Sequence, residues 1–271
     1  MNTFDSQVEL RQAVLNCLAQ KNAVVKANAV RQLARDWQAG AVLLDTDKML
    51  SESQAIPGRP DKPELIAPRL LKRRTMNTPE GRVALIHALA HIEFNAINLA
   101  LDVIWRFANM PEQFYSDWLK VADEEAYHFS LLNAHLQTFD VNYGDFEAHN
   151  SLWEMAERTK ESVLARIALV PRTMEARGLD ATPQLRSKLA QVGDMAAAEI
   201  LDIILRDEIG HVAIGNHWFN WLCSQSAQEP VATYRQLTEQ YSAPKLRPPF
   251  NLDARRQAGF TEVELEYLGA L

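Results

Sequence analysis

The chain has 271 residues, of which 47% are hydrophobic and 23% charged, a balance typical of a globular protein and not of a disordered chain. Its formal net charge of −7 argues against general attraction to nucleic acid or to an anionic membrane surface. No run of about 18 uncharged apolar residues occurs, so we expect no membrane-spanning helix. The segment 1–7 is polar and predicts no signal peptide, while Cys17 and Cys223 lack metal-ligand spacing. We therefore expect a cytoplasmic protein with free thiols.

Long stretches rich in Ala, Leu, Glu and Arg, with few glycines, predict an all-α fold. Residues 5–39 show the pattern of two short amphipathic helices, with Asp5 and Ser6 as candidate caps of the first. Four prolines exclude a long helix between residues 44 and 78. Basic side chains gather in this connector, namely Arg59, Lys62, Arg69, Lys72, Arg73 and Arg74. A solvated surface is the simpler interpretation of them, and an anion- or phosphate-binding edge is the alternative. Residues 1–78 thus form a region of N-terminal helices and Pro-rich connector.

Four long helices are predicted next, and they make residues 79–223 a four-helix bundle. Their predicted ranges are 80–109, 111–140, 150–178 and 183–223. The first and the last begin at Thr-Pro pairs, in which Thr can cap the helix and Pro occupies its first turn. Pro171 should kink the third helix. Residues 224–271 are predicted to be an irregular tail that packs on the bundle and ends in a short helix over 261–268.

An acidic pattern occurs twice in the predicted bundle. In the first copy, Glu93 is followed 32 residues later by Glu125, which opens a Glu-x-x-His motif with His128. The second copy has a gap of 33 residues and consists of Glu175, Glu208 and His211. Residues three apart share a helix face, and a gap of this length fits a helix, a short turn and an antiparallel helix that returns to the same height. Two such hairpins would bring four carboxylates and two imidazoles together.

The positions of these residues in the helical pattern support a metal site. Glu93 lies in the middle of an apolar stripe that runs from Ile86 to Ile104, where an unpaired charge is costly. The combination of four glutamates and two histidines is the ligand set of di-iron and di-manganese bundles. Mixed oxygen and nitrogen ligands suit Fe or Mn, and Glu125 and Glu208 are expected to bridge the two ions.

The third helix gives the least regular pattern. Stepping back from Glu175 along its face leads to Glu161 and Glu157, either of which could replace it as the ligand. Their distances along the chain to Glu208 break the symmetry of the two copies, so Glu175 is favoured.

Other polar residues near the motifs are candidates for supporting roles. The residue before each Glu-x-x-His is acidic, and Asp207 or Glu124 could hold a ligand histidine by its other ring nitrogen. For Glu124 a solvated helix face is equally compatible. Four further histidines lie off the ligand face or too far along it, and packing is the favoured interpretation for them: His87, His91, His135 and His217.

Several segments resemble signatures of the ferritin-like superfamily, and within it of a poorly characterised bacterial family. These segments are His87–Asp102, Asp123–His128, Leu169–Pro183 and Arg206–His211. The resemblance covers most of the chain, and a more distant one exists to the tRNA hydroxylase of methylthio-isopentenyl-adenosine. It implies a ferritin-like four-helix bundle with a di-metal site formed by Glu93, Glu125, His128, Glu175, Glu208 and His211. It does not imply a substrate, because members of this superfamily differ in activity.

Three functions are compatible with these observations. The favoured one is an Fe/Fe or Mn/Fe enzyme that activates dioxygen to oxidise or hydroxylate an unidentified substrate. Such an oxidoreductase would act on a small molecule or, through the basic connector, on RNA, and a hydroxylase would also need an electron donor. The alternatives are an iron-handling ferroxidase or storage protein and a non-enzymatic helical interaction module. We expect a small homo-oligomer that does not bind membranes.

Overall fold

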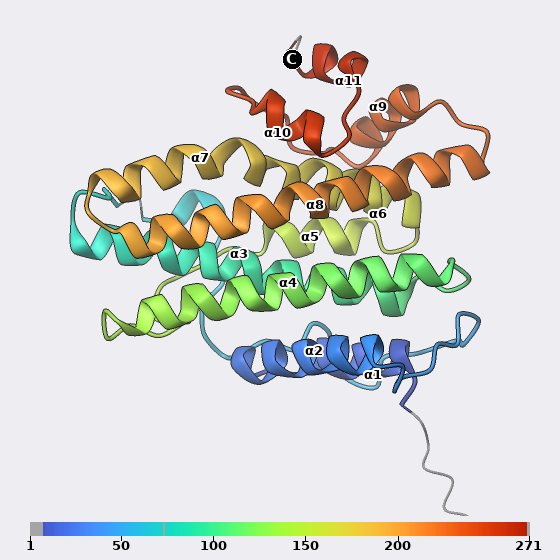
Figure 1. Cartoon of the computed structure of the whole chain (residues 1–271), viewed down its shortest axis with the longest axis horizontal. Coiled ribbons are helices and arrows are strands. Elements are labelled where there is room, and N and C mark those ends of the chain that lie inside the picture. The colour runs from blue at the N-terminus through green and yellow to red at the C-terminus, as the bar shows by residue number, and fades with distance from the viewer. Residues whose placement is uncertain (1–7, 73, 270–271) are drawn as a thin grey trace, which may run out of the picture. The chain divides into compact units, whose positions relative to one another are not determined.

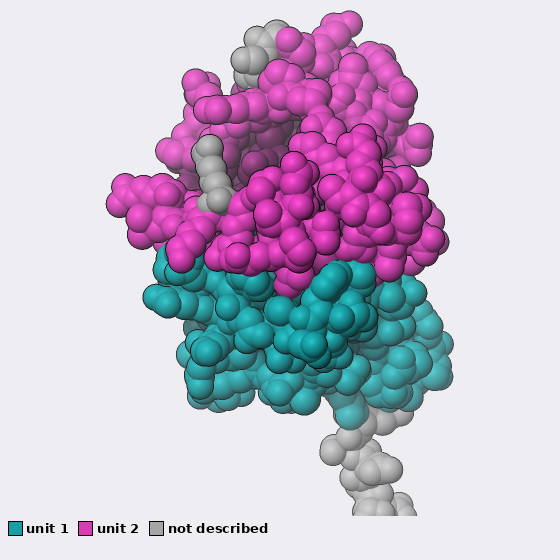
Figure 2. Space-filling model, turned by 90° about the vertical axis from the view of Figure 1, so that its left-hand side faces the viewer, with its two compact units in different colours: residues 1–66, 87–148 teal, residues 67–86, 149–271 magenta. Residues whose placement is uncertain are grey.

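The computed structural model describes residues 8–72 and 74–269, and these residues confirm the all-α prediction. Within them the only β-type pairings are two isolated bridges, between Glu9 and Leu43 and between Leu65 and Ala148. The caps predicted at Asp5 and Ser6 lie outside the described residues, as does Arg73 of the basic connector. The chain divides into two compact units (Figure 2). Unit 1 comprises residues 1–66 and 87–148, and unit 2 comprises residues 67–86 and 149–271.

Unit 1 contains α1 (Leu10–Ala19), α2 (Ala23–Gln38), α4 (Glu112–Gln137) and most of α3 (Pro79–Arg106) (Figure 1). The side chains of Glu9 and Asn22 accept backbone N–H groups at the starts of α1 and α2. Helix α2 packs on α1 and along α4. Helices α3 and α4 start within one residue of the predicted bounds, because Pro79 and Pro111 mark their real starts, and both end three residues earlier than predicted.

Two buried cations fasten the N-terminal region to α3. The guanidinium of Arg11, which is 1% exposed, donates to the carbonyls of Ile104 at 3.2 Å and Trp105 at 2.7 Å. These carbonyls belong to the last turn of α3, where the helix itself offers no donor. The Nζ of the fully buried Lys26 donates to the carbonyl of Gly58 at 2.8 Å and to the side chain of Asn98. The connector is therefore fixed against α3 over its first part.

Helix α3 is long and apolar enough to cross a membrane by length and composition alone. However, 72% of its most apolar window is buried inside the protein, as expected for the core helix of a globular protein.

Unit 2 contains the 3-10 turn η1 (Pro68–Leu70), α5 (Ser151–Arg158), α6 (Val163–Leu169), the π-helical turn η2 (Val170–Glu175), α7 (Ala176–Gln191) and α8 (Met195–Gln225). Helices α7 and α8 form a long antiparallel pair (Figure 1). The predicted bounds of the third and fourth helices, 150–178 and 183–223, are wrong in two respects. The third is interrupted at 159–162 and then continues to 191, and the fourth begins at 195.

Side chains that lie elsewhere in unit 2 explain both errors. Pro183 lies inside α7 and not at a helix start, and its missing N–H leaves the carbonyl of Leu179 without a helical donor. The amide Nδ2 of Asn251 supplies a donor to that carbonyl at 3.2 Å. At the interruption, the buried guanidinium of Arg166 donates to the Ala156 carbonyl at 2.6 Å and to Thr159 Oγ1 at 3.0 Å. The broken helix end is thus satisfied by a side chain.

The tail is more helical than predicted. The short helix expected over 261–268 is present as α11 (Glu262–Gly269), and two further helices, α9 (Pro230–Gln240) and α10 (Leu252–Gln257), occupy the part predicted to be irregular. The tail packs on α7 and α8 through a hydrophobic cluster. The buried members of this cluster are Ala176, Leu179, Val212, Leu246, Ala254, Ala258, Phe260, Leu265 and Leu268.

Candidate metal centre

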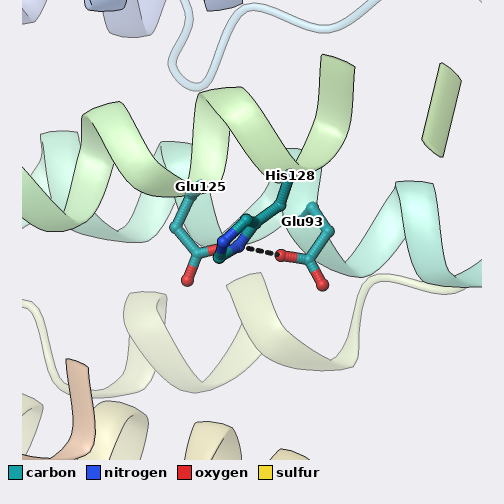
Figure 3. Close-up of side chains that lie close together, drawn as sticks. All are labelled: Glu93, Glu125 and His128. Atoms are coloured by element: carbon teal, nitrogen blue, oxygen red, sulfur yellow. Dashed lines mark hydrogen bonds and ion pairs between the residues drawn. The ribbon is translucent and has the colours of Figure 1, made fainter. Parts of the chain in front are cut away.

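The first copy of the acidic pattern converges inside unit 1. Glu93 comes from α3, Glu125 and His128 come from α4, and the two carboxylates lie on either side of the imidazole (Figure 3). The Nδ1 atom of His128 is 3.3 Å from Glu93 Oε2 and 3.3 Å from Glu125 Oε2. One donor atom from each side chain lies within 4.8 Å of the other two, as ligands of one ion would. The structure therefore brings these three predicted residues close together.

The local sequence explains this geometry. Glu125 and His128 are three residues apart, so α4 presents both on one face. Glu93 replaces an apolar residue in the buried stripe of α3, between the buried Ala90 and Ile97. All three side chains are buried, with exposed fractions of 6% for Glu93, 1% for Glu125 and 0% for His128.

The electrostatics of the triad favour a bound cation. Burial raises the pKa of Glu93 well above its usual value, the neighbouring Glu125 carboxylate raises it further, and the hydrogen bond to His128 lowers it. Two buried carboxylates that face one imidazole are costly to ionise together. A divalent ion would offset this cost by accepting one ligand atom from each side chain, and the mixed oxygen and nitrogen donors fit Fe or Mn. The oxygen and nitrogen donors of the triad are therefore suited to bind a divalent Fe or Mn ion.

Unit 2 carries the counterpart of this motif on α8. The Nδ1 atom of His211 is 3.2 Å from Glu208 Oε2, within the same i, i+3 arrangement. Both side chains are buried, with exposed fractions of 8% for Glu208 and 0% for His211. The two Glu-x-x-His motifs thus have the same internal geometry.

Glu175 lies at the end of the π-helical turn that precedes α7. It is half-buried. Gly178 lies about one turn further on the same helix face, and a Cβ atom there would approach Glu208 Cγ at 3.6 Å and Oε1 at 3.7 Å. The face of α7 that carries Gly178, about one turn after Glu175, therefore meets Glu208. The kink predicted from Pro171 is confirmed as a π turn, whereas ligation by Glu175 stays a prediction.

The alternative ligands of the third helix are exposed. Glu161 lies in the interruption between α5 and α6, and Glu157 accepts a hydrogen bond from Trp153 Nε1 at 3.0 Å at the surface. Neither occupies a buried helix face, so burial makes Glu175 the better candidate.

The proposed supporting residues have surface partners. Asp207 accepts hydrogen bonds from the neighbouring Arg206 guanidinium at 2.8 and 3.0 Å, and Glu124 forms an ion pair with Lys120 at 3.4 Å. Their support of the ligand histidines stays a prediction.

The remaining histidines are occupied by packing and hydrogen bonds. His91 Nδ1 is 2.8 Å from the Tyr143 hydroxyl, and His87 Nε2 accepts the backbone N–H of Gly144 at 2.8 Å. His135 is half-buried and His217 is exposed.

Sequence reasoning missed two residues that position the second copy of the motif. One is Gly178, whose spacing from Glu175 could have indicated a close approach to a neighbouring helix. The other is Arg172 in η2, a buried arginine whose Nη1 donates to Asn216 Oδ1 at 2.7 Å and whose Nη2 pairs with Glu264. Its guanidinium lies 4.6 Å from the ring centroid of Phe219. No periodic signal marks such an arginine, because its partners come from distant segments.

The fold and the site define an all-α protein whose buried carboxylate and histidine side chains can hold metal ions. The chain belongs to the DUF455 family, described as a protein family of unknown function, whose model matches residues 19–266. It is 51% identical over 216 residues to an uncharacterized protein of Haemophilus influenzae, an alignment that covers 77% of this chain and 75% of that protein. No solved structure matches the chain.

Proposed function

We propose that the protein is a di-metal carboxylate enzyme, with two Fe ions or one Mn and one Fe, that uses dioxygen to oxidise or hydroxylate an organic substrate. The observation that carries the proposal is the buried triad of Glu93, Glu125 and His128. Burying three ionisable side chains at one level of a helical core costs folding free energy unless a cation is bound, and these side chains serve no packing purpose. Their donor types are those that Fe and Mn prefer.

A second ion is proposed because the motif is repeated. Glu175, Glu208 and His211 repeat the order and spacing of the triad, and the Glu208–His211 pair repeats its local geometry. In the proposed centre the two ions would be held by Glu93, Glu125, His128, Glu175, Glu208 and His211. The resemblance to ferritin-like bundles supports this assignment, because the same ligand set occurs there.

The two metals, when bound, would supply the electrons that reduce dioxygen. The protein's own residues would fix the ions and keep water out. Phe94 and Phe129 directly follow Glu93 and His128, are 2% and 1% exposed, and pack against each other with ring centroids 5.7 Å apart. Together with Tyr143, whose ring lies 5.2 Å from that of Phe129, they form an aromatic cluster in unit 1. The burial of Glu93, Glu125 and His128 themselves would exclude solvent from a reactive centre.

Oxygen consumption tests the enzyme against the iron-store alternative. The protein loaded with Fe(II) without air should consume dioxygen when air is admitted, with a change in its optical spectrum. It should oxidise little Fe(II) beyond its bound pair, because a catalytic centre has no need of a cavity for mineral. His128→Ala should abolish the reaction, whereas His217→Ala, which alters an exposed histidine of α8, should leave it intact. Sustained uptake of Fe(II) into a large particle would refute the enzyme proposal.

A further inference from the structure

A cleft of about 650 Å³ opens on unit 2 between α7 and the segment 244–250 that leads to α10. Three cationic side chains line it, namely Arg177 of α7 and Lys245 and Arg247 of the opposite segment. All three are exposed, and none forms an ion pair or hydrogen bond with any residue in the ranges 8–72 and 74–269. Three uncompensated positive charges around one cleft are unusual in a chain whose net charge is −7.

The single carboxylate in the cleft lining does not neutralise these cations. Asp180 is engaged by the buried Arg255, whose Nη2 donates to Oδ2 at 2.6 Å and whose Nε donates to Oδ1 at 3.0 Å. The Oδ1 atom also accepts the backbone N–H of Asn251 at 2.9 Å. Asp180 is thus committed to a structural network, and the lining is left with an excess of positive charge.

Both walls of the cleft are held in place before any ligand binds. Asn251 ties the segment to α7 through Asp180 and through the carbonyl of Leu179. Leu246 is only 9% exposed and is anchored in the hydrophobic cluster of the tail, whereas its two neighbours, Lys245 and Arg247, are exposed. Proline restricts the backbone at Pro244. A site whose walls are fixed loses little entropy when a ligand is bound.

The cleft lining also includes apolar side chains. Phe250 is half-buried, packs against the hydrophobic cluster and lines the cleft together with Pro244 and Pro249. The cleft volume falls within the range of about 300–1,000 Å³ that is typical of small-molecule sites. Three cations and an aromatic ring that line one cleft match a ligand that carries phosphate at one end and a planar or apolar group at the other.

We infer that this cleft binds a small organic phosphate of nucleotide size, with its phosphate held by Arg177, Lys245 and Arg247 and its ring on Phe250. The site lies within unit 2 and uses none of the proposed metal ligands. Its existence therefore does not depend on the proposed oxidation.

Calorimetric titration of the full chain with ADP and with pyrophosphate tests this inference. ADP should bind saturably at one site per chain and more tightly than pyrophosphate, because only ADP has a ring to place on Phe250. Each of Arg177→Gln, Lys245→Gln and Arg247→Gln should weaken ADP binding about five- to tenfold, the effect of one charge-assisted hydrogen bond. The triple variant should show no measurable binding.

Two further variants distinguish specific binding in the cleft from general electrostatic attraction of ADP to the protein. Lys188→Gln removes one charge from the exposed surface of α7 outside the cleft and should leave ADP binding unchanged. Phe250→Leu keeps an apolar side chain in the cluster but removes the ring, so it should weaken ADP binding while pyrophosphate binding stays the same. The inference is overturned if ADP does not saturate, if the triple variant binds as well as the wild type, or if Lys188→Gln weakens binding as much as the cleft variants do. Tighter binding of citrate than of ADP would also overturn it, in favour of a carboxylate ligand.

Discussion

At the scale of single residues, the histidines divide by the partners that surround them. His128 and His211 lie 3.2–3.3 Å from glutamate oxygens, where a metal ion would be expected. His87 is different, because its Nε2 accepts the N–H of Gly144 at 2.8 Å and its ring stacks on Tyr143. Only a neutral imidazole can accept this hydrogen bond. Burial accordingly lowers the pKa of His87 to about 4.

This pKa predicts a contribution of His87 to acid sensitivity. Because the folded-state pKa lies below the unfolded value of about 6.5, the unfolded chain binds more protons between these values, and stability is lost as the pH falls through this window. The contribution is at most about 3 kcal/mol. His87→Gln keeps an acceptor but cannot titrate. Urea unfolding at a series of pH values should therefore show a smaller loss of unfolding free energy between pH 6.5 and pH 4 in this variant than in the wild type.

The exposed His217 provides the control for this measurement. His217→Gln should reproduce the wild-type dependence of stability on pH. If His87→Gln and the wild type lose the same unfolding free energy between pH 6.5 and pH 4, His87 is not held neutral in the folded protein.

At the scale of secondary-structure elements, the π turn η2 is the feature that places Glu175. In this turn Pro171 packs against Gly215 of α8. A Cβ atom added at position 215 would lie only 3.0 Å from Pro171 Cβ. Arg172 fastens the same turn to α8 through Asn216 and to α11 through Glu264. π turns are frequent at functional sites because they rotate the following side chains relative to a regular helix. The tail thus supports the element that presents the predicted ligand.

Substitution of two glycines of α8 tests the role of this packing. Gly215→Ala should push η2 away and lower the unfolding free energy by about 1–3 kcal/mol, the usual cost of overpacking. Gly210→Ala lies in the same helix, where a Cβ atom meets nothing within 4 Å, and should raise stability by about 0.5–1 kcal/mol through reduced chain entropy. Chemical denaturation compares the two variants. If Gly215→Ala is as stable as Gly210→Ala, close contact between Pro171 and α8 does not shape the turn.

At the scale of the whole molecule, the sequence predicted those parts of the fold that depend on local signals. The all-α class and the bounds of α3 and α4 follow from composition and from prolines at helix starts. Pro183 misled the prediction because its missing hydrogen bond is replaced by Asn251, 72 residues from Leu179 along the chain. The interruption at 159–162 was missed for a similar reason, since Arg166 stabilises it from the next helix. Neither hydrogen bond can be recognised in the hydrophobic periodicity of the helix that it stabilises.

The same distinction applies to the candidate site. Glu125 with His128, and Glu208 with His211, were predictable because an i, i+3 pair needs only a helix to share a face. Glu93 was predictable as an acid within an apolar stripe. The position of Glu175 depends on a π turn, on a proline packed against a glycine and on an arginine clamped by the tail. None of these could be inferred from the periodicity of its own segment.

Metal stoichiometry tests the central claim, that the repeated motif holds two metal ions, most directly. Native mass spectrometry of the protein loaded with Fe(II) should show two ions per chain. Replacement of Glu125 and Glu208 together by Ala should remove both, because these residues are proposed to bridge the pair. The matched variant with Glu157→Ala and Glu161→Ala alters two exposed glutamates and should keep both ions. Two equivalents of iron retained by the Glu125→Ala/Glu208→Ala variant would contradict the account.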